Sequence, residues 1–437
     1  MAVRSVTALS GAAGVALVAL SGAASADDWF KTVKFSGYVE VGGIGNSGQP
    51  NSNLNWGQLF TDRDNEIMMN QLSLIVSRDI DAKKQYDFGF KFQGMYGTDA
   101  RYTHFLGELD KVTDAQYQLD IVEAWGQFHT PWLGTGGTDI KIGQYVTPLG
   151  NEVIDPRGNF FYSHDYIFNF GLPLKHTGIL ADTHVNSMLD VYYGVDTGVN
   201  TTFGDPGDPN DSASFLGGFG LNLLKGDLTI LALTHIGKVL PSEGDPGFFF
   251  GPTQGDGPVR TRYYGDIVAT YKWNKKLTTT YEFNYVQDDT PGFGTTDHGA
   301  TAYGIADYWL YALTDNVSIG LRSEWFRDQN GAFVSACPGN LDFVKSEEGL
   351  QNNCFSSNLL PGLAGVPGGV PPLQGTNYYD ETIALNWKPE VPKAFEGMVV
   401  RPEARWDYSS NTRPFNDGTE HNQFTFGADV IVPFASQ

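Results

Sequence analysis

The stretch QFTFGADVIVPFASQ, residues 423–437, carries an apolar side chain at every second position. The apolar positions are Phe424, Phe426, Ala428, Val430, Val432 and Phe434, and the polar or small ones include Thr425, Gly427 and Asp429. Such alternation is typical of a β-strand with one apolar and one polar face. A soluble sandwich would bury the apolar face against a second sheet, whereas a membrane barrel would turn it toward lipid. The connections between strands decide between these two folds.

The same alternation recurs along the chain, for example in LTTTYEFNYV (277–286), VSIGLRSEWF (317–326), VVRPEARWDY (399–408) and YDFGFKFQGMY (86–96). Seven short links separate such segments: 79–83, 131–138, 183–186, 224–227, 273–276, 312–316 and 389–397. Eight longer links alternate with them: 45–65, 98–115, 146–174, 196–212, 237–257, 288–298, 328–376 and 409–421. Fifteen connections of alternating length predict an antiparallel transmembrane β-barrel of about sixteen strands, with short periplasmic turns and long extracellular loops. Residues 117–130 and 228–236 alternate poorly, so eighteen strands is the alternative.

The aromatic residues fall at two levels of the predicted strands. One group lies beside the short links and comprises Tyr271, Trp273, Trp309, Tyr311 and Trp387. A second group lies beside the long links and comprises Tyr96, Tyr285, Trp325, Tyr379, Tyr408 and Phe424. Two aromatic bands are expected at the two membrane–water interfaces. A general preference of aromatics for strands would explain their number but not these two levels. The apolar face of residues 424–434 is therefore expected to face lipid, and its free edge is expected to pair with the first strand, near 33–41.

The start of the chain and its composition indicate export. Residues 1–26 have a basic residue, an apolar stretch and an Ala-Ser-Ala site, as in a cleaved secretory signal peptide, which leaves 27–437 as one barrel domain. A formal net charge of −22 argues against nucleic acid as a partner. Cys337 and Cys354 lie close together in the long link 328–376, and an oxidising compartment favours a disulfide between them over two free thiols.

Several short motifs give the chain a family resemblance. They are Gln144-Tyr145, the turn 147–150 followed by Glu152, and Pro173 with His-Thr-Gly at 176–178. Together with FSGYVEVGG (35–43) and NQLSLIVSRDI (70–80), they resemble the OmpL-like family of β-barrel porins. The resemblance implies a pore in the outer membrane of a Gram-negative bacterium. It does not imply a particular solute.

The long link 146–174 is the candidate constriction, because analogy with other barrels favours its folding into the lumen. An outward, Ω-like loop is the alternative. The candidate pore-lining residues are Glu152, Asp155 and Arg157 in this link and, on the wall, Lys91, Arg322, Glu324, Arg401, Glu403, Arg405 and Asp407. On a lipid face each basic residue would cost about 2–4 kcal/mol at mid-membrane, so they are expected to face inward. Two roles stay open for them: a transverse field that sorts solutes by charge, or salt bridges that brace the wall.

The predicted function is passive diffusion of small hydrophilic solutes or ions, and the alternative is a closed structural or adhesion barrel acting through its loops. Motifs of hydrolases, zinc proteases and phosphate-binding loops are absent, so no enzyme is predicted. No cofactor is predicted; Ca²⁺ at the acidic segments 62–66 and 205–211 is a weaker alternative. The expected partners are outer-membrane lipid, lipopolysaccharide and the diffusing solutes. A homotrimer is expected by analogy with barrels of this size.

Overall fold

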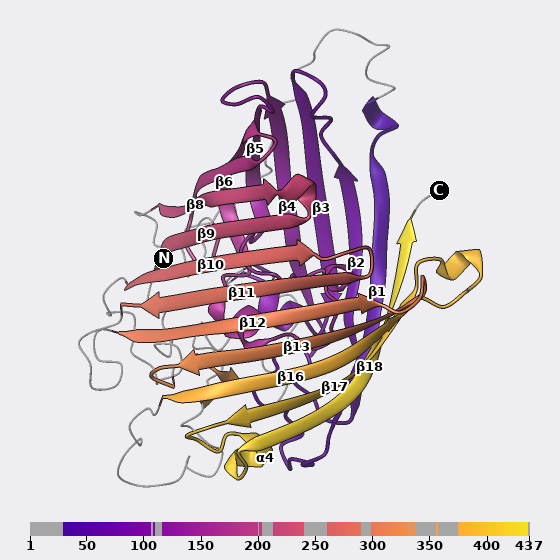
Figure 1. The fold of residues 1–437 in the computed structure, drawn as a ribbon, viewed down its shortest axis with the longest axis vertical. Helices are drawn as coiled ribbons and strands as arrows, with labels where there is room; N and C mark the ends of the chain where they lie inside the picture. Colours follow the sequence, from indigo (N-terminus) through magenta and orange to yellow (C-terminus); the bar gives the residue numbers. More distant parts are fainter. Residues whose placement is uncertain are drawn as a thin grey trace, which may run out of the picture. The chain divides into compact units, whose positions relative to one another are not determined.

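The computed structural model describes residues 29–105, 108–109, 116–199, 201–202, 213–239, 260–289, 299–331, 333–336, 355–356 and 375–435. Residues 34–435 contain one barrel (Figure 1). Of the separate N-terminal unit, the described residues 29–33 form a short turn, in which the Thr32 hydroxyl donates to the Trp29 carbonyl. The predicted signal peptide and both cysteines lie outside the described residues.

Sixteen antiparallel strands close the barrel, which confirms the predicted count. Their bounds are β1 Lys34–Asn46, β2 Glu66–Arg78, β3 Asp87–Gly97, β4 Gln118–Thr130, β5 Thr138–Val146, β6 Lys175–Asn186, β7 Leu189–Asp196, β8 Ser214–Leu223, β9 Leu228–Val239, β10 Arg260–Lys272, β11 Leu277–Asp288, β12 Ala300–Ala312, β13 Val317–Asp328, β16 Thr376–Trp387, β17 Val399–Ser409 and β18 Asn422–Ala435. Each strand pairs with its neighbours in sequence, and β18 closes the ring on β1 in a register that runs from Ser36 opposite Ala435 to Asn46 opposite Thr425.

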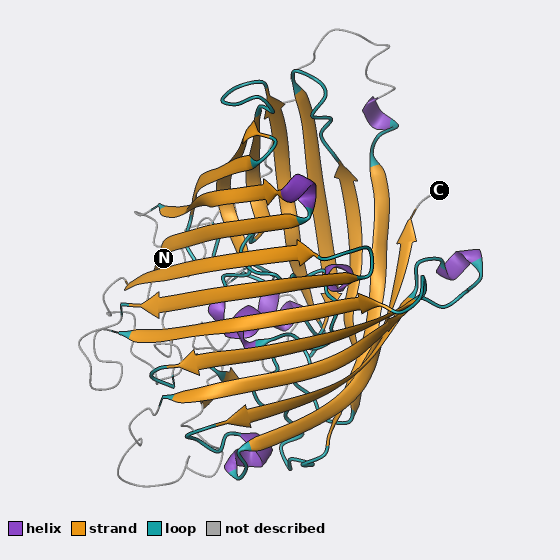
Figure 2. Cartoon of the chain, viewed as in Figure 1, coloured by secondary structure: helices purple, strands orange, loops and turns teal. Residues whose placement is uncertain are grey.

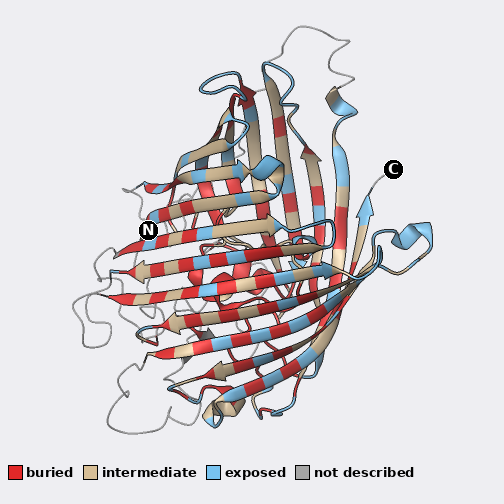
Figure 3. Ribbon diagram, viewed as in Figure 1, coloured by how far each residue is buried: buried red, intermediate tan, exposed pale blue. Residues whose placement is uncertain are grey.

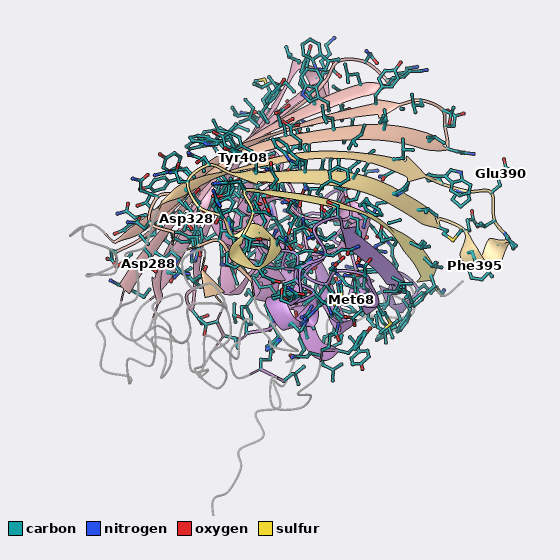
Figure 4. The ribbon with its side chains drawn as sticks, turned by 90° about the horizontal axis from the view of Figure 1, so that it is seen from below. Met68, Asp288, Asp328, Glu390, Phe395 and Tyr408 are labelled. Carbon is teal, nitrogen blue, oxygen red and sulfur yellow. The ribbon has the colours of Figure 1, made fainter. Side chains whose placement is uncertain are left out.

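The connections alternate in length as the sequence predicted. Asp288, Asp328 and Tyr408 mark the end with the long loops, and Glu390 and Phe395 mark the opposite end with the short turns (Figure 4). The long connection between β13 and β16 contains a two-stranded sheet of its own, β14 Ser335–Ala336 and β15 Phe355–Ser356.

Among the described residues, the helices are single turns. They are α2 Ala100–Thr103, η1 Pro156–Gly158, η2 Ile167–Gly171, η3 Leu224–Gly226, η4 Lys393–Phe395 and α4 Phe415–Gly418. Figure 2 shows some of these helical turns inside the ring of strands. A search of the described residues finds no helix with the length and hydropathy needed to cross a membrane.

The two faces of each strand differ in burial, and the banding in Figure 3 follows this alternation. On β18 the outward Phe426 side chain is 55% exposed, whereas its inward neighbour Thr425 is 1% exposed. Outward aromatics such as Trp273 at the short-turn end and Tyr96 at the long-loop end are exposed as well. Apolar side chains therefore face outward toward lipid, and polar ones face the interior, as an outer-membrane barrel requires.

Two strands that alternate poorly in sequence have clear structural reasons. In β4 the register against β3 shifts by one residue between Ile121 and Glu123, so a β-bulge interrupts the alternation. In β9 the inward positions include Leu231 and Leu233, because this part of the wall packs against the apolar cluster inside the barrel rather than against solvent.

Candidate pore constriction

Residues 147–174, which connect β5 and β6, fold back inside the barrel and lie against its inner wall. Two wall carboxylates accept hydrogen bonds from consecutive backbone N–H groups of this segment, hereafter the inner loop. Glu403 of β17 accepts from Tyr162 N at 2.8 Å and Ser163 N at 3.1 Å. Glu324 of β13 accepts from Tyr166 N at 2.7 Å and Ile167 N at 2.9 Å, at the start of η2. The wall thus satisfies donors that would otherwise be buried without partners.

Asp266 of β10 and Glu282 of β11 act in the same way at the beginning of the inner loop. Asp266 accepts from Gly150 N at 3.0 Å, and Glu282 accepts from Asn151 N at 3.3 Å. Gln71 of β2 instead donates to the Ile154 carbonyl at 2.8 Å. The inner loop is therefore attached to strands on both sides of the β1–β18 seam.

Three wall arginines hold the carbonyl groups of the same segment. Arg401 donates to the carbonyls of Pro156, Asn159 and Phe161 at 2.9–3.0 Å. Arg322 donates to the Ser163 carbonyl at 2.7 Å, and Arg405 donates to the His164 carbonyl. Carboxylates neutralise the three cations: Asp429 and Glu40 pair with Arg401, Glu152 and Asp380 with Arg322, and Asp407 and Asp380 with Arg405.

Small wall residues leave room for the aromatic side chains of the inner loop. A Cβ added at Gly42 of β1 would lie 2.5 Å from the Tyr162 ring, and one at Gly320 of β13 would meet the Phe160 ring in the same way. The inner loop contributes further buried side chains, including Phe168, to one apolar cluster with the wall. Tight packing at these points fixes the position of the loop backbone.

Two buried acids within the inner loop differ in charge state. Burial opposes ionisation of Glu152, but Arg322 and His164 outweigh it and lower its pKa to about 2. Burial together with the Glu152 charge raises the pKa of Asp165 to about 7, although it accepts hydrogen bonds from the Tyr308 hydroxyl and Phe168 N. Glu152 therefore ionises at a much lower pH than Asp165.

The predicted pore-lining residues divide into two sets. Seven of them are buried beneath or within the inner loop: Glu152, Arg322, Glu324, Arg401, Glu403, Arg405 and Asp407. Their contacts favour the bracing role over a field that acts directly on solutes. The side chains of the other three are partly exposed: Lys91 at 24%, Asp155 at 27% and Arg157 at 35%.

Further partly exposed charges lie on β3 and β5, near the short turns that precede these strands. Lys91 pairs with Glu123 across β3 and β4, and Lys141 of β5 stands 4.7 Å above the Trp125 ring. Among the described residues Lys141 forms no ion pair. The sequence analysis missed Lys141, although its place between Ile140 and Ile142 marks it as inward-facing.

Toward the rim of the long-loop end, two other loops also enter the barrel. Trp56 and Leu59 from the first long loop and Tyr102 from α2 join the internal apolar cluster. Asp62, at the start of the acidic segment 62–66, is bound here, because its carboxylate accepts hydrogen bonds from Arg101 at 2.8 and 3.0 Å. The second acidic segment, 205–211, lies outside the described residues.

A closed antiparallel barrel of sixteen strands with an inward loop has the architecture of an outer-membrane porin. The family model described as "Putative beta-barrel porin-2, OmpL-like" matches residues 32–434, and the chain belongs to this family. It is accordingly an outer-membrane porin, as the sequence analysis predicted.

Several solved structures have a similar fold. The outer-membrane channel DcaP of Acinetobacter baumannii has a TM-score of 0.52 at 11% identity, covering 92% of this chain and 97% of its own. The anion-selective porin of Comamonas acidovorans scores 0.54 at 9% identity, covering 92% and 99%. OprB of Pseudomonas putida scores 0.51 at 13% identity, covering 94% and 97%. No curated protein matches the sequence.

Proposed function

We propose that small hydrophilic solutes and ions diffuse passively past the inner loop and along the wall formed by β3–β7, where Lys91, Lys141 and Asp182 are partly exposed. One observation carries this proposal: the wall side chains that bond to the backbone of residues 150–167 come from β2, β10, β13 and β17, together with Glu282 of β11. Among the described residues, strands β3–β7 make none of these bonds, and this is the side on which we place the passage, because β8 and β9 pack against the internal apolar cluster through Leu216 and Leu233. Passage requires no chemistry by the protein, and we propose none.

The partly exposed charges along this wall include Lys91 and Lys141 as well as Asp182 of β6 and Asp190 of β7, both beside His184. Arg157 lies on another side, 4.4 Å above the Tyr38 ring of β1, and its charge is paired with Asp155. Lys91 is paired with Glu123, and Lys141 has no ion-pair partner among the described residues. A fixed unpaired cation at a narrow point attracts anions and repels cations, because low-dielectric walls strengthen its field. We therefore propose that Lys141 moves the selectivity of the pore toward anions. The anion selectivity of the Comamonas acidovorans porin, which has a similar fold, is in keeping with this.

Reversal potentials in a planar bilayer under a KCl gradient test both parts of the proposal. Wild-type protein should give stepwise conductance, and Lys141→Gln should move the reversal potential toward the cation-selective limit. Lys275→Gln is the matched control, because it removes the same charge from an exposed short turn. A K141Q channel with the selectivity of wild type would refute the role of Lys141.

A closed barrel that acts through its loops remains the second candidate, and one observation favours it. Three long loops fill the interior toward the long-loop end with apolar side chains, including Trp56, Tyr102 and Phe168. A folded, inserted protein that never conducts would reject diffusion in favour of this alternative. We place the short turns on the periplasmic side, and protease accessibility of the turns from each side of the membrane tests this orientation. A homotrimer stays a prediction, which chemical cross-linking in detergent would test.

A further inference from the structure

Three side chains inside the barrel converge at the long-loop ends of their strands. They are His176 of β6, Asp196 at the end of β7 and His235 of β9. Asp196 Oδ2 lies 3.1 Å from His176 Nδ1 and 2.9 Å from His235 Nε2, and one ligand atom from each residue lies within 4.8 Å of the other two. All three side chains are fully buried. We propose that this cluster is a binding site for one divalent transition-metal ion.

The spacing of the ligand atoms fits a metal ion of the Zn²⁺ class. Nitrogen and oxygen ligands lie about 2.0–2.2 Å from zinc, so two ligands at a tetrahedral angle stand about 3.3 Å apart. The two measured separations to Asp196 are close to this value. Imidazole nitrogens favour zinc, copper or nickel, whereas calcium and magnesium require oxygen ligands.

Buried polar atoms near this cluster have no hydrogen-bond partner in the protein, which points to a bound ligand. His176 Nδ1 faces Asp196 but makes no hydrogen bond, and His235 Nδ1 is buried and unpartnered as well. The Tyr145 ring lies 5.7 Å from the His176 ring, and its buried hydroxyl also has no hydrogen-bond partner. Buried polar groups are nearly always satisfied, so the unpaired His176 Nδ1 beside a fully buried carboxylate requires an explanation.

The charge of Asp196 leads to the same conclusion. Its carboxylate is fully buried, and its only ion-pair partners among the described residues are the two histidines. The Gly198 N–H donates to it at 3.0 Å, which is a single backbone bond. A buried carboxylate needs a cation nearby, and an ion bound between these three side chains would provide one. A bound divalent ion would supply the charge and use the nitrogen lone pairs at the same time.

One histidine already has the outer partner that ligating histidines usually have. The far nitrogen of His176, Nε2, lies 3.0 Å from the Thr147 hydroxyl, which fixes the ring with Nδ1 toward Asp196. Thr147 is the first residue of the inner loop, and its backbone N–H donates to the Leu174 carbonyl at the other end of that loop. A metal ion would therefore fasten β6, β7 and β9 to one another and to the root of the inner loop. This proposal does not rest on diffusion through the pore.

Zinc content tests the proposal directly. Protein without a polyhistidine tag is stripped with chelator, incubated with Zn²⁺, freed of excess metal by gel filtration and analysed by mass spectrometry for zinc per chain. One equivalent is expected for wild type, and at least a tenfold weaker zinc affinity is expected for His235→Gln and Asp196→Asn. Thr147→Val keeps all three ligands and is expected to weaken zinc affinity by about 10–100-fold, through the orientation of His176.

A second group of potential ligands provides the matched control. Asp182, His184 and Asp190 also have ligand atoms within 4.8 Å of one another, but their side chains are partly exposed, so water can satisfy them without a metal ion. His184→Gln should therefore keep the full equivalent of zinc. Heat-modifiable migration on gels verifies that each variant is folded. If a ligand variant does not fold, the zinc affinity of Thr147→Val tests the proposal instead. Wild type without zinc, or His235→Gln with the affinity of wild type, would overturn the proposal, as would loss of zinc in His184→Gln.

Discussion

Replacing Arg401 by methionine is expected to release the inner loop from the wall. Arg401 holds the carbonyls of Pro156, Asn159 and Phe161, and it is paired with Asp429 and Glu40. Methionine has a similar length but no donors. The substitution therefore leaves three loop carbonyls and two wall carboxylates without their partner.

The magnitude follows from these contacts. Three charged hydrogen bonds at about 1.5–3 kcal/mol each give an upper bound of roughly 5–9 kcal/mol, and such contributions are not additive. Removal of one partner of a buried ion pair costs about 3–5 kcal/mol in other proteins, which we take as the expected value. A change of that size raises the population of the released loop by about 10²–10⁴-fold.

Trypsin provides the assay, because Arg157 is the single Lys or Arg in residues 147–174. Cleavage after Arg157 requires the loop to leave its site, and its rate follows the released population when release is fast. Mass spectrometry of the peptide that begins at Gly158 measures this rate in folded protein. The R401M variant should be cleaved about 100-fold faster than wild type or more, and its single-channel current should be noisier.

Two variants control this experiment. Arg413→Met removes an exposed arginine whose side chain donates to His421, and it should leave cleavage unchanged. Arg157→Gln should abolish the cut itself. If folded R401M is cleaved after Arg157 no faster than R413M, the wall arginines do not hold the inner loop.

Three further predictions concern pH, packing and lipid contact. The pKa of Asp165 is about 7 in the folded protein and 3.8 ordinarily. Its contribution to stability is therefore complete below about pH 4 and is lost as the pH rises through 7. Thermal unfolding measured from pH 4 to 8 should show this loss of stability in wild type and a smaller loss in Asp165→Asn. Gly42→Ala should cost about 1–3 kcal/mol in urea unfolding, because its Cβ meets the Tyr162 ring, and it fails as a prediction if stability is unchanged. Ile305→Lys should cost about 2–4 kcal/mol, because this exposed mid-strand residue faces lipid, and an unaltered unfolding midpoint would contradict that orientation.

The strand count and the closure could be predicted from sequence because lipid and interior impose opposite polarity on alternate residues. Every outward position contacts lipid, so apolar residues at alternate positions, such as Phe424 and Phe426, identify the lipid-facing side of each strand. Prediction from the alternation of apolar and polar residues is weaker where the barrel interior is itself apolar. Leu231 and Leu233 of β9 face inward onto the internal cluster, and there the alternation disappears.

The site was less accessible to sequence reasoning, for a physical reason. Parity shows that Arg322 and Arg401 face inward, but it does not show what they meet there. The structure shows backbone carbonyls of a distant loop, 159 residues from Arg322 and 240–245 from Arg401. The histidines of the proposed metal site come from separate strands, so no short sequence motif could have predicted that they lie together.

The pairing of β1 with β18 has a consequence for how the chain reaches its native state. Ser36 and Ala435 lie opposite each other, although roughly 400 residues separate them, and bringing such ends together costs about 5 kcal/mol of chain entropy beyond a constant. The ladder between them is the last that hairpin-by-hairpin assembly can form, since every other pair joins strands adjacent along the barrel chain. Until it forms, two unpaired edges are open to other chains. Assembly of this protein therefore depends on shielding its first strand for as long as the ribosome and the export machinery take to deliver the last.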